Sequence, residues 1–140
     1  MPKALLDTDI LSEILKGANP AVMRRAAAYV AEHNVLAFTS VTVYEIVTGL
    51  EKNQMQARLR RTQRVFEQNE EIVPENEDYQ LAGRILGTLR RSGKEVGYSD
   101  PLVAACAIRR GLILVTGNQK HFEYIHEAGF SLAIEDWRAP

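Results

Sequence analysis

Short apolar runs recur along the chain, and several of them end at a polar residue. They lack the polar and apolar alternation of a half-buried strand, so we interpret them as strands covered on both faces of a parallel sheet. The expected strands are 3–6, 35–38, 71–73, 112–115 and 130–134.

Between these runs the apolar positions follow the three- and four-residue spacing of amphipathic helices. Ile10, Leu11, Ile14 and Leu15 show this spacing in the first segment. Residues expected to cap a following helix are Asn76, Ser99 and Asn118. The expected helices are 9–16, 21–33, 41–50, 54–68, 76–92, 99–110 and 118–125.

The alternation of strands and helices predicts an α/β fold in which residues 1–140 form a single domain. Parallel strands joined through helices require right-handed crossovers, which place helices on both faces of the sheet. We therefore expect three layers around a central parallel sheet of about four or five strands. Ligands of such open sheets bind outside the carboxyl ends of the strands.

Composition and charge narrow the class of function. The formal net charge of the 140 residues is -1, so a polyanion would have to be held by a local basic face or a metal ion, which argues against a passive nucleic-acid coat protein. The one cysteine, Cys106, lies in an apolar run and is expected to pack as a buried thiol. An acid follows the start too soon for a secretory leader, and no apolar run reaches transmembrane length, so we expect a cytoplasmic protein.

Three acids, Asp7, Glu45 and Asp100, occur in apolar surroundings without a basic neighbour. Buried carboxylates that lie together normally become protonated, pair with Arg or Lys, or bind a metal ion. Asp7 and Thr116 follow expected strands, Asp100 begins a helix, and Glu45 lies one turn into the helix after the second strand. We expect these residues to meet at the carboxyl edge of the sheet, where a shared cation would relieve their repulsion.

Each acid also has a purely structural interpretation. Asp7 can simply end a strand, and Asp9 can cap the helix that follows. Glu45 can complete a capping box with Thr42. Asp100 is favoured near a helix N-terminus by roughly 0.3–1 kcal/mol. Each interpretation is adequate alone, but together they leave the gathering of three acids at one edge unexplained.

Four motifs occur in a fixed order along nearly the whole chain. They are Leu-Asp-Thr-x-x-Leu-Ser, a Ser-x-x-x-x-Glu stretch with a later Gly, Asp-x-x-Val-Ala-Ala, and an apolar strand leading into Thr-x-Asn-x-x-x-Phe. They occupy residues 6–12, 40–49, 100–105 and 114–122. In this order and spacing the sequence resembles the PIN domains, and most closely their VapC-type toxin branch, which are metal-dependent ribonucleases.

The resemblance implies a PIN-like fold and hydrolysis of RNA phosphodiester bonds by metal-activated water. Asp7, Glu45 and Asp100 would hold Mg²⁺ or Mn²⁺, and Thr116 and Asn118 would orient a water molecule or the scissile phosphate. It also implies a toxin homodimer and a VapB-like antitoxin that blocks the site. Single-stranded regions are the expected target, because unstacked bases are easier to read than an A-form helix.

The sequence departs from the family pattern in the last motif. Family members often carry a fourth acid where Asn118 or His121 stands, and neither is acidic here. Three carboxylates should hold one ion well and a second only weakly. His121 is interpreted as a surface residue or phosphate contact, or alternatively as a ligand of a softer ion such as Mn²⁺. Asp9 stands where the family usually has Asn and would be an additional outer acid.

Basic side chains on the helices are candidate contacts with the RNA backbone, although most are expected to be solvated helix faces. Aromatic residues make up only 7% of the chain, so no base preference is predicted. The basic candidates are Arg58, Arg61, Arg64, Arg90, Arg91, Lys94, Arg109 and Arg110.

Two other functions stay open at this point. The missing fourth acid is compatible with a degenerate PIN domain that binds RNA or a protein without cleavage. The Asp-x-Asp at residues 7–9 also occurs in haloacid-dehalogenase phosphatases, where the first Asp is the nucleophile. That family needs a Gly-Thr soon afterwards and a late acidic pair, whereas residues 10–11 are Ile-Leu and residues 116–118 are Thr-Gly-Asn.

Overall fold

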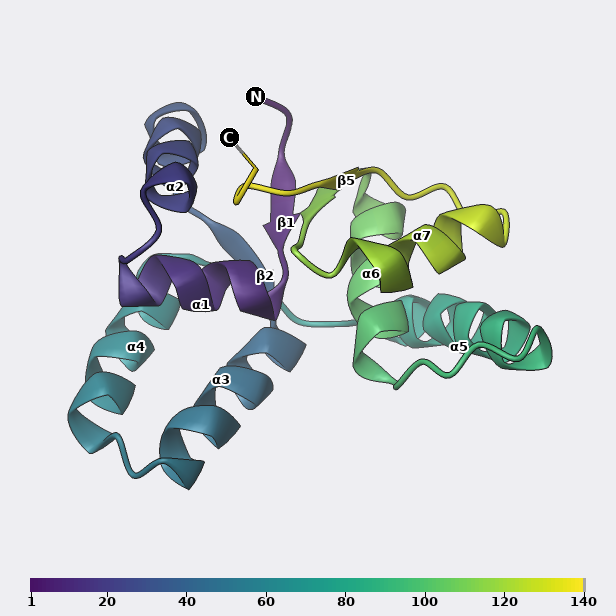
Figure 1. The fold of residues 1–140 in the computed structure, drawn as a ribbon, viewed down its shortest axis with the longest axis horizontal. Coiled ribbons are helices and arrows are strands. Elements are labelled where there is room, and N and C mark those ends of the chain that lie inside the picture. The colour runs from purple at the N-terminus through teal and green to yellow at the C-terminus, as the bar shows by residue number, and fades with distance from the viewer. Residues whose placement is uncertain (140) are drawn as a thin grey trace.

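The computed structural model describes residues 1–139 and shows parallel strands surrounded by helices (Figure 1). The strands are β1 (Ala4–Leu6), β2 (Ala37–Thr39), β3 (Glu70–Ile72), β4 (Ile113–Val115) and β5 (Ile134–Glu135). The helices are α1 (Thr8–Lys16), α2 (Pro20–His33), α3 (Ser40–Lys52), α4 (Gln56–Gln68), α5 (Asn76–Arg91), α6 (Ser99–Arg110) and α7 (Gln119–Glu127). The predicted α/β class and the predicted order of strands and helices are confirmed.

The strands form two hydrogen-bonded groups. One has the order β1-β4-β5 and the other pairs β2 with β3, and every pairing is parallel. β1 and β2 are neighbours, but strand pairing is interrupted between them. The predicted number and direction of strands are therefore confirmed, while the layer contains a seam.

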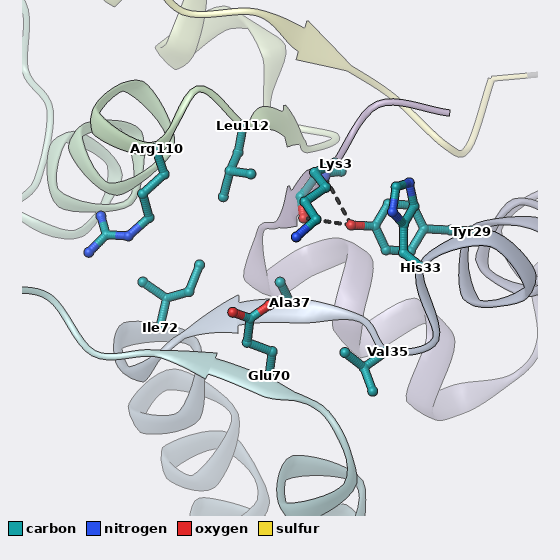
Figure 2. Close-up of a pocket in the computed structure, with 10 residues that line it drawn as sticks. Lys3, Tyr29, His33, Val35, Ala37, Glu70, Ile72, Arg110 and Leu112 are labelled. Atoms are coloured by element: carbon teal, nitrogen blue, oxygen red, sulfur yellow. Dashed lines mark hydrogen bonds between the residues drawn. The ribbon is translucent and has the colours of Figure 1, made fainter.

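Tyr29 contributes to this seam. Lys3 and Asp7 direct backbone groups toward β4, so the backbone groups of Ala4 face the side of β2. The Ala4 N–H donates to Oη of Tyr29 at 3.0 Å, and the same hydroxyl lies 3.4 Å from the Ala4 carbonyl, to which it donates. A pocket of about 350 Å³ opens beside it, at the amino ends of the strands, with Lys3 and Glu70 in its lining (Figure 2). This pocket lies at the sheet edge opposite the predicted acids.

The core is divided by the strand layer, as expected for strands buried on both faces. In β1 the side chain of Leu5 packs with α5, α6 and α7, whereas Leu6 packs with α1, α2 and Phe38 of β2. Cys106 is fully buried in the first of these clusters, and burial raises the pKa of its thiol to about 11. The prediction that it packs as a small hydrophobic residue is confirmed.

Some element boundaries differ from the prediction because capping and pairing depend on neighbours. Asp7, not Asp9, is the N-cap of α1, and Glu75, not Asn76, caps α5 in a capping box with Asp78. The last strand forms at Ile134–Glu135 instead of 130–134. The chain turns after the end of α7 at Gly129, whose φ of 97° lies in the left-handed region that favours glycine. None of the helices within residues 1–139 has both the length and the apolar character needed to cross a membrane.

Candidate functional site

The site begins where β1 and β4 end side by side. Leu6 lies opposite Val115 in the parallel pairing, so the next residues, Asp7 and Thr116, emerge together at the carboxyl edge. The Thr116 hydroxyl donates to Oδ2 of Asp7 at 2.8 Å, and the Thr8 N–H donates to Oδ1 at 2.9 Å. Both Asp7 and Thr116 are buried. Thus the sheet register brings together two residues that are far apart in sequence.

Asp7 is held in surroundings that disfavour its ionised form. The residue is only 7% exposed, and burial, followed by the negative charges of Asp9 and, more weakly, Asp100, raises the pKa of its carboxyl group from 3.8 to about 7. The hydrogen bonds from Thr116 and the Thr8 N–H oppose this rise. The carboxyl group would ionise far more readily if a cation were beside it.

Asp100 joins the same edge from the first turn of α6. Asn118 links the two halves of the site, because its N–H donates to Oγ1 of Thr116 at 3.0 Å and its side-chain amide donates to Oδ2 of Asp100 at 3.5 Å. His121 also reaches Asp100, with 2.9 Å between Nδ1 and Oδ2. Four predicted residues, Asp7, Thr116, Asn118 and Asp100, therefore form one continuous hydrogen-bonded chain.

His121 is held against the site by its contact with Asp100. Instead of standing apart as an isolated surface residue, its ring is half-buried and paired with Asp100. A proton on Nδ1 lets the ring donate to the carboxylate, which keeps Oδ2 oriented. His121 thus belongs to the site through its contact with a predicted metal ligand.

Glu45 reaches the site through Thr8. Its Oε1 accepts a 2.6 Å hydrogen bond from the Thr8 hydroxyl, which also lies 2.9 Å from the hydroxyl of Thr42. The capping-box interpretation of Glu45 is wrong, because the helix starts at Ser40 and its cap is Thr39. Glu45 is exposed, so apolar sequence neighbours were misleading here: in a helix, adjacent residues face different directions.

Asp9 acts as a brace between the first and last motifs. Its carboxylate accepts from the Gly117 N–H at 2.9 Å and from the Ile10 N–H at 2.8 Å. Arg138 closes over the same loop by donating to the Gly117 carbonyl at 2.9 Å. Burial raises the pKa of Asp9, although these N–H groups lower it. Asp9 therefore fixes the loop that carries Thr116 and adds negative charge near Asp7.

The donor set fits a hard divalent cation in chemistry and charge. Within residues 1–139, the Arg and Lys ion pairs do not involve Asp7, Glu45 or Asp100. Their carboxylate oxygens are the ligands that Mg²⁺ prefers. In the same part of the chain, however, no group of three Asp, Glu, His or Cys side chains is already arranged as a metal cage. The ligand assignment therefore stays a prediction.

Two of the predicted RNA contacts have another role. Arg109 and Arg110 each donate to Oδ1 of Asp78 at 2.8 Å, and Asp78 is fully buried. Burial opposes ionisation of Asp78, yet hydrogen bonds from Arg110, the Glu75 N–H and Arg109 hold its pKa well below its usual value. These arginines stabilise the contact between α5 and α6, so their guanidinium groups are already engaged within the protein.

The sequence interpretation missed a group of exposed tyrosines beside the acids. Tyr44, Tyr79 and Tyr98 line a groove of about 390 Å³ between α3, α5 and the start of α6. Two of them lie next to motif acids in the sequence, since Tyr44 precedes Glu45 and Tyr98 lies two residues before Asp100. Their proximity to the motif acids in the sequence could have indicated a role near the site, but attention to the low overall aromatic content left it unused.

Known proteins share recognisable sequence with this chain over most of its length. The family model described as "PIN domain" matches residues 4–127. The chain is 32% identical to the tRNA(fMet)-specific endonuclease VapC of Shigella flexneri, with 98% of this chain and 99% of the relative covered. It is 30% identical to the protein of the same name from Salmonella typhimurium, again with 98% and 99% covered.

The fold is also shared with a solved structure. A chain in the crystal structure of DNA-bound VapBC from Salmonella typhimurium superposes with a TM-score of 0.82 at 28% identity, covering 98% of this chain and 99% of that chain. These comparisons give no support to the haloacid-dehalogenase interpretation of residues 7–9. From the extent of the family match and the agreement in fold, this chain belongs to the PIN domain family.

Proposed function

We propose that this protein is a metal-dependent endoribonuclease and the toxin component of a VapBC-like toxin-antitoxin pair, acting in the cytoplasm. Residues 1–140 would form one nuclease domain. The observation that supports the proposal most directly is the hydrogen-bonded chain from Asp7 through Thr116 and Asn118 to Asp100, at the edge where open parallel sheets bind ligands. Curated relatives with the same extent carry ribonuclease names.

Asp7, Asp100 and Glu45 would hold Mg²⁺ or Mn²⁺. When bound, such an ion lowers the pKa of water and offsets negative charge on the phosphate, which supplies the chemistry of phosphodiester hydrolysis. The resemblance implies a fourth acid at the position of either Asn118 or His121, and neither is acidic here, so one ion would be held well and a second weakly.

The neighbouring side chains would position the reacting groups. Thr116 orients Asp7 through its 2.8 Å hydrogen bond, and His121 does the same for Asp100 at 2.9 Å. Asn118 is neutral and lies at the start of α7, so its amide can approach a phosphate without charge repulsion. No side chain is required as a nucleophile.

The proposed antitoxin partner is supported by similar solved structures. Several similar solved structures are described as VapBC complexes, and we propose that a VapB-like antitoxin binds this chain and blocks the acidic edge. We also propose a homodimer. Light scattering of the isolated chain and of its complex with the antitoxin would measure both assemblies.

Cleavage of bulk RNA by the purified protein tests the activity. We expect cleavage in Mg²⁺ or Mn²⁺, its loss in EDTA, and at least a hundred-fold slower rates for Asp7→Asn, Glu45→Gln and Asp100→Asn, because each removes a charged ligand. Binding of RNA without cleavage by the wild type would favour the degenerate PIN domain instead. Equal cleavage by all variants would show that the residue assignment is wrong.

A further inference from the structure

The groove lined by Tyr44, Tyr79 and Tyr98, here named the tyrosine groove, is an unusual surface for this chain. Their exposed fractions are 77%, 55% and 75%. Among residues 1–139 only six large apolar or aromatic side chains are markedly exposed, and half of them are these tyrosines. Apolar surface concentrated in this way normally marks a binding site.

The tyrosine groove adjoins the acidic edge. Tyr44 and Ser40 come from the first part of α3, which also carries Glu45, while Tyr98 and Ser99 lead directly into Asp100. Figure 1 shows the first turns of α3, α5 and α6 facing one another beyond the carboxyl end of β1. A nucleic-acid strand that is bound at the acids could therefore continue along the tyrosine groove.

The charges around the tyrosine groove suit a nucleotide. Its lining contains no acidic residue. The guanidinium of Arg90 lies over the Tyr98 ring, 4.9 Å from the ring centroid. A cation in this position can contact a phosphate while the open part of the ring remains available to a base.

We propose that the tyrosine groove binds an unstacked base of single-stranded RNA next to the scissile phosphate. The proposal rests on the proposed nuclease function and names how its substrate is held. Aromatic rings accept any base, since every base has a flat π-face, and each such contact contributes strongly to binding. Such contacts do not distinguish one base from another, which agrees with the absence of a predicted base preference.

Binding of a labelled, unstructured RNA oligonucleotide tests the proposal, measured by fluorescence anisotropy in an Asp7→Asn background that prevents cleavage. We expect Tyr44→Ala and Tyr98→Ala each to raise Kd about 5- to 150-fold, which corresponds to about 1–3 kcal/mol. Tyr44→Phe and Tyr98→Phe should stay within about two-fold, because the ring is kept. Val30→Ala, an exposed apolar position on α2, is the matched control.

A second oligonucleotide with abasic sites separates stacking from contacts with the backbone. The alanine variants should bind it no worse than the parent protein does, since there is no base to lose. Thermal unfolding of each variant should match the parent, because these side chains are exposed.

Unchanged RNA affinity in the alanine variants would overturn the proposal. If these variants instead lose only the binding of a VapB-like protein, the proposal is also overturned and the groove belongs to that partner. Because binding is measured without cleavage, this result is independent of the activity test. Equal RNA cleavage by the wild type and the alanine variants would likewise reject the proposed role of the tyrosine groove, while the nuclease function would remain supported.

Discussion

The Thr116 hydroxyl donates a hydrogen bond to Oδ2 of Asp7, 109 residues away in the sequence, and the two oxygen atoms are 2.8 Å apart. This bond joins the ends of β1 and β4 and stabilises the ionised form of a carboxyl group that burial would otherwise keep protonated. The same hydroxyl accepts from the Asn118 N–H. The neutral side chain of Thr116 thus orients the Asp7 carboxylate and positions Asn118 beside Asp100.

Replacing Thr116 by Val keeps the shape of the side chain and removes both hydrogen bonds. We expect Thr116→Val to lower the rate of RNA cleavage about 10- to 100-fold and to raise the Mg²⁺ concentration for half-maximal activity, as for other groups that orient a metal ligand. Thr116→Ser keeps the hydroxyl and should stay within about three-fold of wild type. Equal activity of the Val and Ser variants would show that this bond does not matter.

Asp7 should make the metal-free protein less stable as the pH rises. Its pKa is about 7 in the folded protein and 3.8 ordinarily, so the folded state binds its proton more tightly. The stabilisation is complete below about pH 4 and is lost as the pH rises to about 7, with an upper bound of roughly 4 kcal/mol. Urea unfolding in EDTA should show this fall for wild type relative to Asp7→Asn.

Mg²⁺ should reverse the effect, because a cation favours the ionised carboxylate. At pH 8 we expect Mg²⁺ to raise the free energy of unfolding of wild type and to leave Asp7→Asn nearly unchanged. Parallel stability curves for the two proteins from pH 4 to pH 8 would contradict the description of Asp7 as a buried acid that awaits a cation.

Asp78→Asn should destabilise the fold without touching the site. The variant leaves Arg109 and Arg110 without their shared buried carboxylate, and we expect a loss of about 3 kcal/mol in the free energy of unfolding. Glu77→Gln is the control, because Glu77 is exposed and lies 4.0 Å from Arg109; it should change stability by less than about 0.5 kcal/mol. Similar unfolding midpoints for both variants would refute the structural role given to Asp78.

Asn118→Asp would introduce an acid at one of the two positions where the family resemblance implies one. Since Asn118 already contacts Asp100 and Thr116, the added carboxylate should strengthen binding of divalent ions, and we expect the Kd for Mn²⁺ to fall roughly ten-fold. Isothermal titration calorimetry of both proteins measures this change. Weaker or equal binding by Asn118→Asp would place the ion away from this residue.

Local sequence patterns predicted the parts of the fold that depend on local physics. The unalternated apolar runs at β1 and β4 identified buried parallel strands, and their order located Asp7 and Thr116 at the edge where the structure has them. The spacing of apolar residues likewise identified the helices. Such patterns report burial of a whole element, so they are informative about topology.

Features that depend on contacts between distant elements could not be predicted in this way. Apolar neighbours suggested that Glu45 is shielded, but its helix turns it outward to Thr8. From the sequence Arg110 was expected to be a solvated basic residue, whereas in the structure it binds the buried Asp78 of α5. The tyrosine groove is formed by Tyr44 of α3, Tyr79 of α5 and Tyr98 just before α6. The position of two of them near motif acids was a local signal, but their convergence depends on how the helices pack.

We propose above all that Asp7 and Asp100, together with Glu45, share one divalent cation. A crystal structure of the purified protein grown with Mn²⁺ tests it directly through the anomalous difference density at the carboxyl edge. We predict one strong peak in contact with carboxylate oxygens of Asp7 and Asp100, and its absence in Asp7→Asn. A map without a peak there at saturating Mn²⁺, or with the ion bound by other residues, would contradict the claim.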